Sequence, residues 1–118
     1  MNLRLLNLRL LLWCVLACLL VACAYVDATT TQYVGVPRFP PGDPKAVQIL
    51  RGEPMQPHER LGEILLDISV DPPAEIAEVE QRLKEEAAKW GVNAVFVVRD
   101  QVMPGVSRKL IAVAIRYR

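Results

Sequence analysis

The stretch DPPAEIAEVEQRLKEEAAKWGVNAVFVVRD, residues 71–100, decides the fold because it encodes a helix that leads directly into a buried strand. Asp71 and Pro72 suit the N-cap and first position of a helix, and Gly91 suits a left-handed C-terminal cap. Apolar residues between them recur at spacings of three and four and form one stripe: Ile76, Val79, Leu83, Ala87 and Trp90. We therefore predict a helix that begins at Pro72, ends before Gly91 and packs on a sheet through this stripe.

Strand patterns lie on both sides of this helix. After it, residues 94–99 (AVFVVR) and 110–117 (LIAVAIRY) flank a loop with Pro104-Gly105, a pair suited to a type II turn, and predict an antiparallel hairpin. Before it, residues 46–50 form a short strand candidate, and residues 61–70 alternate with a period of two. We expect an α+β domain over residues 46–118, with a small sheet of about four strands in ββαββ order and one helix packed on one face.

The last two predicted strands are apolar on both sides, a pattern typical of strands that are covered on both faces. A single helix covers only one face, so the other face is a candidate interface. We assign to it the following residues: Val95, Val97, Ile111, Val113 and Ile115. Three occupants remain open, namely the segment Tyr33–Phe39 of the same chain, a second copy of the protein, or a different protein partner.

The first 22 residues have the character of a targeting segment. A short region with Arg4 and Arg9 precedes an apolar run over residues 10–26. Within this run the sequence Leu20-Val21-Ala22-Cys23 resembles the lipobox of bacterial lipoprotein precursors. The resemblance implies that residues 1–22 are a signal peptide, cleaved before Cys23, and that the Cys23 thiol forms a thioether to diacylglycerol. Further acylation of the freed amine then anchors the mature protein stably on a bilayer.

Residues next to this cysteine carry information on location. In the sorting pattern of Gram-negative lipoproteins, an aspartate directly after the cysteine favours the inner membrane, whereas Ala24 fits the outer membrane, facing the periplasm. Residues 23–45 then read as a lipidated N-terminus and a tether, because a threonine cluster at 29–31 and four prolines disfavour a helix or a central strand. Cys14 and Cys18 leave with the signal peptide, so no intrachain disulfide is expected.

The part from Ala46 to Arg118 resembles small bacterial envelope proteins with the YbjQ/RcsF-like fold. The resemblance rests on residues 61–64 (LGEI), on the helix end with its following strand at residues 85–95 (EEAAKWGVNAV), and on residues 112–116 (AVAIR). It implies a strand that leads into a helix and then a hairpin. YbjQ-like members form ring-shaped homo-oligomers and have a proposed heavy-metal role, whereas RcsF-like members are outer-membrane lipoproteins that sense envelope stress through protein partners.

Composition argues against several other functions. Of the 14 basic residues, Arg4 and Arg9 lie in the signal peptide, and the other 12 nearly balance the 13 acidic ones, so no nucleic acid is expected as a partner. His58 is the single histidine; we expect it in a solvated turn, and alone it makes a weak metal site. No catalytic constellation is present. The sequence therefore predicts a non-enzymatic protein-interaction domain without metal or cofactor; the alternative is a ligand- or metal-sensing envelope module.

Overall fold

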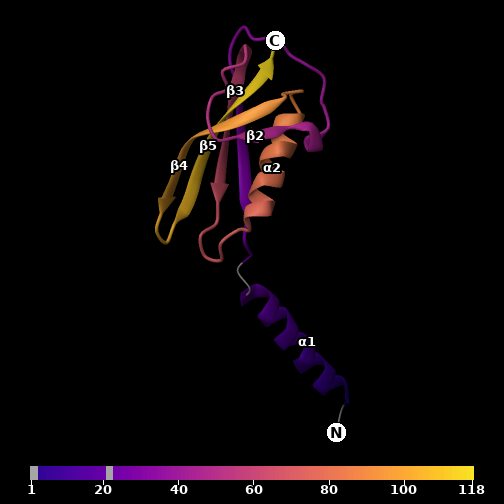
Figure 1. The fold of residues 1–118 in the computed structure, drawn as a ribbon. Coiled ribbons are helices and arrows are strands. Elements are labelled where there is room, and N and C mark those ends of the chain that lie inside the picture. Colours follow the sequence, from indigo (N-terminus) through magenta and orange to yellow (C-terminus); the bar gives the residue numbers. More distant parts are fainter. Residues whose placement is uncertain (1–2, 21–22) are drawn as a thin grey trace.

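The computed structural model describes residues 3–20 and 23–118, and it contains one separate helix and one α+β domain (Figure 1). Helix α1 (Leu3–Leu20) lies apart from the domain, and its side chains up to Leu16 are exposed. In the predicted cleavage motif, Val21 and Ala22 lie outside the described residues. Within the described ranges, no helix combines the length and apolar character that a membrane crossing requires.

A single five-stranded sheet in the order β1-β3-β5-β4-β2 forms the domain. Neighbouring strands are antiparallel, except that β2 runs parallel to β4. The strands are β1 (Val26–Gln32), β2 (Gln48–Leu50), β3 (His58–Ile68), β4 (Ala94–Met103) and β5 (Ser107–Tyr117). Helix α2 (Ile76–Ala88) packs on one face of the sheet (Figure 1). The α+β class is confirmed, but the prediction of four strands in ββαββ order is wrong because a further strand precedes the others.

Strand β1 occupies the first part of the predicted tether. It pairs with β3 over its whole length, from Val26 opposite Ile68 to Gln32 opposite Gly62. Alternate residues of β1 are half-buried, and the residues between them are exposed. Threonine is a good strand former because its β-branched side chain fits a pleated, half-buried surface. The threonine cluster that suggested a tether therefore forms the edge of the sheet.

The proline-containing segment after β1 is also held by the domain. Phe39 packs against the helix-side core, and its ring lies 3.8 Å from the guanidinium carbon of Arg116. Arg116 Nη1 also donates to the carbonyl oxygen of Gly91 at 2.7 Å. A Cβ at Gly91 would collide with the carbonyl oxygen of Pro40 and with the Phe39 side chain, and Gly91 has a φ of 68°. Glycine is therefore required there both for its conformation and for the close approach of this segment.

The start of α2 differs from the prediction, whereas its end agrees. The helix begins at Ile76, and Asp71 and Pro72 lie in the preceding turn. Glu75 occupies the N-cap position without a side-chain cap hydrogen bond. The later residues of the predicted stripe are buried, but Ile76 is 73% exposed. The helix ends at Ala88, three residues before the left-handed Gly91, so the predicted C-terminal cap region is confirmed.

Candidate functional site

The five residues of the predicted interface do not share one face of the sheet. In the observed register Phe96 lies opposite Val113, and Val95 lies opposite Ala114. Val95 and Val97 therefore point to the helix-side core, in which Val95 is fully buried. Val113 and Ile115 belong to the opposite face. The prediction combined two faces because strand register cannot be read from two uniformly apolar strands.

The face opposite α2 is closed over its centre by the same chain. Its central residues are almost fully buried: Ala94, Phe96, Val113 and Ile115. Leu50 and Tyr117 pack against them, and the guanidinium carbon of Arg60 lies 5.7 Å from the centre of the Phe96 ring. The predicted surplus of apolar surface thus exists, but the chain itself covers this part of it. The covering side chains come from β2, β3 and β5, not from the segment Tyr33–Phe39.

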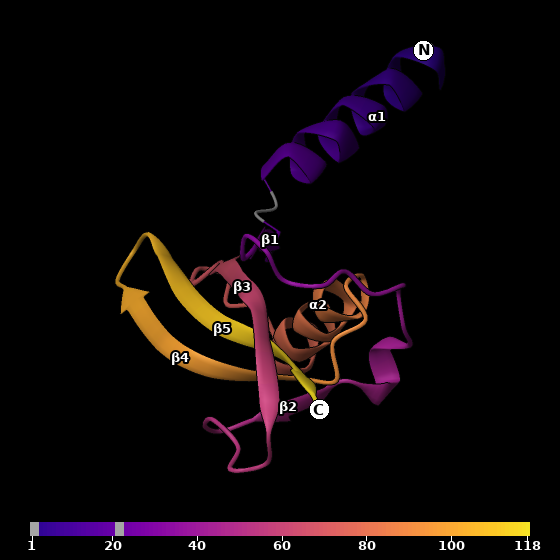
Figure 2. The ribbon, with the colours of Figure 1, turned by 90° about the horizontal axis from the view of Figure 1, so that it is seen from above.

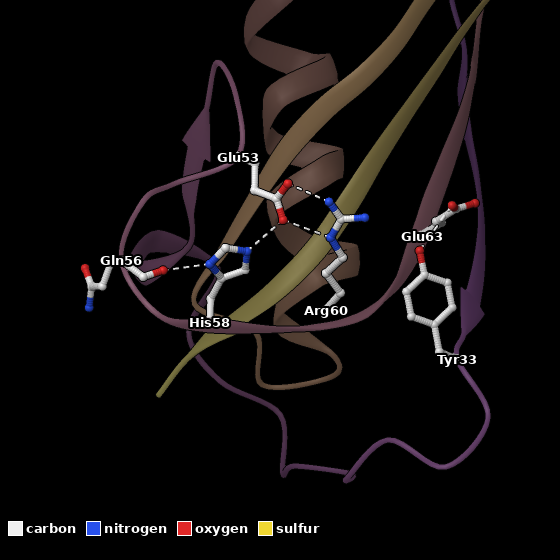
Figure 3. Close-up of polar contacts among 6 residues, drawn as sticks. All are labelled: Tyr33, Glu53, Gln56, His58, Arg60 and Glu63. Atoms are coloured by element: carbon white, nitrogen blue, oxygen red, sulfur yellow. Dashed lines mark hydrogen bonds and ion pairs between the residues drawn. The ribbon is translucent and has the colours of Figure 1, made fainter.

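A polar cluster holds the loop between β2 and β3 beside this covered face (Figure 3). Glu53 accepts hydrogen bonds from Arg60 Nη2 at 2.5 Å, from Arg60 Nε at 2.9 Å and from His58 Nε2 at 2.9 Å. These bonds lower the pKa of Glu53 to about 2. His58 Nδ1 lies 2.7 Å from the carbonyl oxygen of Gln56. The pKa of His58 is raised, mainly by the hydrogen bond to the Gln56 carbonyl and then by the one to Glu53, because both acceptors stabilise the protonated ring.

We call the hydrogen-bonded group of Glu53, Gln56, His58 and Arg60 the clasp. His58 is therefore part of this clasp and not the solvated turn histidine that the sequence suggested. It is the first residue of β3, and its side chain is only 13% exposed. Both ring nitrogens face hydrogen-bond acceptors, which favours the imidazolium form over the neutral form that binds metals. Across the part of the chain that the structure describes, no group of three or more His, Cys, Asp or Glu side chains could hold a metal ion.

This clasp makes a prediction for titration. We expect the pKa of His58 to lie above its usual 6.5, and Glu53→Gln to lower it because the carboxylate charge is lost. With the folded pKa above the unfolded one, the stabilisation by His58 is complete below about 6.5 and is lost as the pH rises through the folded value. Nuclear magnetic resonance of the single imidazole measures this directly. Equal pKa values in the wild type and in Glu53→Gln would refute the clasp.

The structure forms a groove between α2 and the β2–β4 side of the sheet, with a volume of about 960 Å³. In Figure 2 the β4–β5 hairpin curves away from α2. The groove has an apolar lining: Val47, Ile49, Leu50, Ile76, Val79, Leu83, Val97 and Leu110. Charged and polar residues complete it: Gln48, Arg51, Glu80, Lys84, Asp100 and Arg108. Val97 is thus the residue of the predicted interface that lines this groove.

The edge of the sheet beside this groove is largely unpaired. Strand β2 has three residues and pairs only with Ala94–Phe96 of β4. From Val97 to Met103, β4 pairs with β5 on one side and with no other strand of the described chain. A register shift between Val97 and Arg99 accompanies this change, and Val98 is 54% exposed. An open strand edge offers backbone donors and acceptors to another extended chain.

Two of the charged residues that line the groove, Asp100 and Arg108, are paired with each other. Arg108 forms two hydrogen bonds with the Asp100 carboxylate, at 2.5 and 2.7 Å, so that these charges neutralise each other. This pairing lowers the pKa of Asp100 and raises the pKa of Arg108. Both shifts move the pKa of the group further from neutral pH, whereas a general acid or base works best with a pKa near the operating pH.

Sequence reasoning missed this groove because it depends on the order of the strands. A short strand at residues 46–50 was predicted, but its parallel place beside β4 was not. The edge of β4 stays open because β2 is much shorter than β4. Which strands become neighbours does not follow from composition.

The predicted lipid-bearing cysteine stands at the entrance to the domain. Cys23 is exposed, and only Ala24 separates it from the first residue held by the sheet. The backbone nitrogen of Tyr25 donates to Ser69 Oγ at 2.9 Å, and the nitrogen of Ser69 donates to the Tyr25 carbonyl oxygen at 3.0 Å. The predicted tether of residues 23–45 is therefore wrong beyond Ala24, because the chain joins the domain at Tyr25.

The fold of this chain also occurs in a solved crystal structure. No family model and no curated protein sequence match this chain. The chain is similar to the crystal structure of a Francisella virulence factor, FvfA, in the orthorhombic form, with a TM-score of 0.57 and 16% sequence identity. The match covers 76% of this chain and 97% of that chain. At this level of identity the similarity shows a shared fold.

Proposed function

We propose that this protein is a lipid-anchored cell-envelope protein whose domain binds a protein partner and catalyses no reaction. The anchor rests on Leu20-Val21-Ala22-Cys23 and on the exposed position of Cys23 ahead of the domain. Ala24 favours the outer membrane, with the domain in the periplasm. The proposal includes a relation to YbjQ/RcsF-like envelope proteins, based on the sequence resemblance of residues 61–64, 85–95 and 112–116. Such a relation supports a domain that binds other proteins.

The groove with its open strand edge is the observation that carries the binding function. An extended segment placed beside β4 from Val97 onwards would continue the sheet where β2 ends. Its backbone would satisfy the free edge, and alternate side chains would enter the groove over Val97 and Leu83. The segment belongs to another envelope protein or to a second copy of this chain; both present the same extended backbone.

Site-specific photocrosslinking tests this proposal. A benzoylphenylalanine at Glu80, on the groove side of α2, should crosslink in intact cells to a partner identified by mass spectrometry. The matched control places the same group at Gln81, an exposed neighbour that does not line the groove. We expect roughly tenfold more of the adduct from position 80, since an extended ligand would contact one face of the helix only. Equal adducts, or none from either position, would contradict the groove as the binding site.

A further inference from the structure

The register of the sheet places the tip of the β4–β5 hairpin level with the anchor. Val26 pairs with Ile68, Ile68 with Arg108, and Arg108 with Val102, so these residues form one row across four strands. Three strand spacings of about 4.8 Å put Val102 roughly 14 Å from Val26. The turn between β4 and β5 and the start of β1 lie at the same end of the domain, the lower end in Figure 1, which faces α1.

Cys23 and the hairpin tip project beyond this row in the same direction. Cys23 precedes Val26 by three residues, which is at most about 10 Å of extended chain. The hairpin continues past Val102 through Met103 and its turn before returning at Ser107. A lipid attached to Cys23 would thus bring a bilayer surface to the level of this tip. Because only Ala24 lies between Cys23 and the domain, the domain has little freedom to rise from that surface.

This tip has the composition of an apolar surface. Residues 101–106 (QVMPGV) carry no charge, and Val102 and Val106 are 57% and 67% exposed. Exposed turns are usually rich in polar residues, so a tip of this kind is unusual in water. At the same end, Ile76 at the start of α2 is 73% exposed, and Tyr25 is 41% exposed. Exposed apolar side chains therefore gather at the end of the domain that carries the anchor.

We propose that the β4–β5 tip docks into the interface of the lipid bilayer that holds Cys23, with Val102 and Val106 as inserted side chains. This inference rests on the proposed lipid anchor and adds an orientation to it. The occupant is lipid because the anchor is separated from the domain by one residue, so the surface that this end faces is the bilayer. The strands then run away from the membrane surface. The exposed residues Val34 and Met55 do not contact the bilayer in this orientation.

Depth-dependent quenching in vesicles tests the docking. The mature lipidated chain has no free thiol, so Val106→Cys introduces a single position for an environment-sensitive fluorophore. In phosphatidylcholine vesicles that contain nitroxide-labelled lipid, we expect this probe to be quenched at least about twofold more than a probe at the control position, because inserted side chains reach about 5–10 Å into the interface. The control is Val34→Cys, which is fully exposed and follows the opposite end of β1.

The outcomes separate the docking from the anchor. Strong quenching at position 106 with weak quenching at position 34, on protein whose mass includes the lipid, supports the docking. Equal, weak quenching at both positions on lipidated protein overturns the docking and leaves the anchor in place. A mass without lipid on Cys23 overturns the proposed anchor, and the docking inference falls with it.

Discussion

Replacing Val113 by glutamate should strongly destabilise the domain. Val113 is 3% exposed and packs with Phe96 and Ile115 under the cover of Leu50 and Tyr117. The substitution removes about 1.5–3 kcal/mol of apolar burial and adds at least about 1–3 kcal/mol for a buried polar group without a partner. A domain of this size has a total stability of only about 5–15 kcal/mol. We therefore expect a loss of about 3 kcal/mol or more in the free energy of unfolding.

Urea unfolding of the mature protein, followed by circular dichroism, measures this loss. The matched control is Val34→Glu, since Val34 is fully exposed and should change stability by at most about 0.5 kcal/mol. If Val113→Glu unfolds at the same urea concentration as the control, Val113 is accessible. In that event the face opposite α2 is an interface after all, as its sequence pattern suggested.

The second large effect concerns Cys23. Replacing it by serine removes the sulfur to which we propose diacylglycerol is attached, and lipid attachment precedes cleavage in the proposed pathway. We expect Cys23→Ser to abolish incorporation of labelled fatty acid completely and to leave residues 1–22 attached. A single acyl chain binds a membrane only marginally. Stable anchoring of the mature protein therefore depends on the full modification of Cys23.

Cys14→Ser is the control for this experiment. Cys14 lies in α1, within the segment that cleavage should remove. Its replacement should leave fatty-acid incorporation at the wild-type level. Labelled lipid on Cys23→Ser, or its loss in Cys14→Ser, would assign the modification to a different cysteine.

The elements that the sequence predicts well are those governed by local rules. The buried stripe Val79, Leu83 and Ala87 follows from helical periodicity, and Gly91 ends the helical region with its positive φ. The hairpin of β4 and β5 follows from two apolar runs separated by a turn. The start of α2 was misplaced because Asp71-Pro72 also suits a turn, and the turn is what forms.

The elements that the sequence does not reveal depend on long-range pairing. β1 has the threonines of a linker and is followed by a proline-containing segment, and it becomes a strand because β3 offers it an edge. Which apolar residues of β4 and β5 share a face depends on register, so Val95 and Val97 were grouped with Val113 and Ile115 in error. The groove needs in addition the parallel place of the short β2 beside β4. Local patterns contain none of these relations.

The central claim is that the mature protein begins at an acylated Cys23, and one measurement tests it most directly. Protein extracted from the membrane fraction of cells that produce the full chain should be analysed by intact mass spectrometry. We predict a chain of residues 23–118 with the added mass of diacylglycerol and an amide-linked acyl group. A chain that retains residues 1–22 and carries no lipid would contradict the claim.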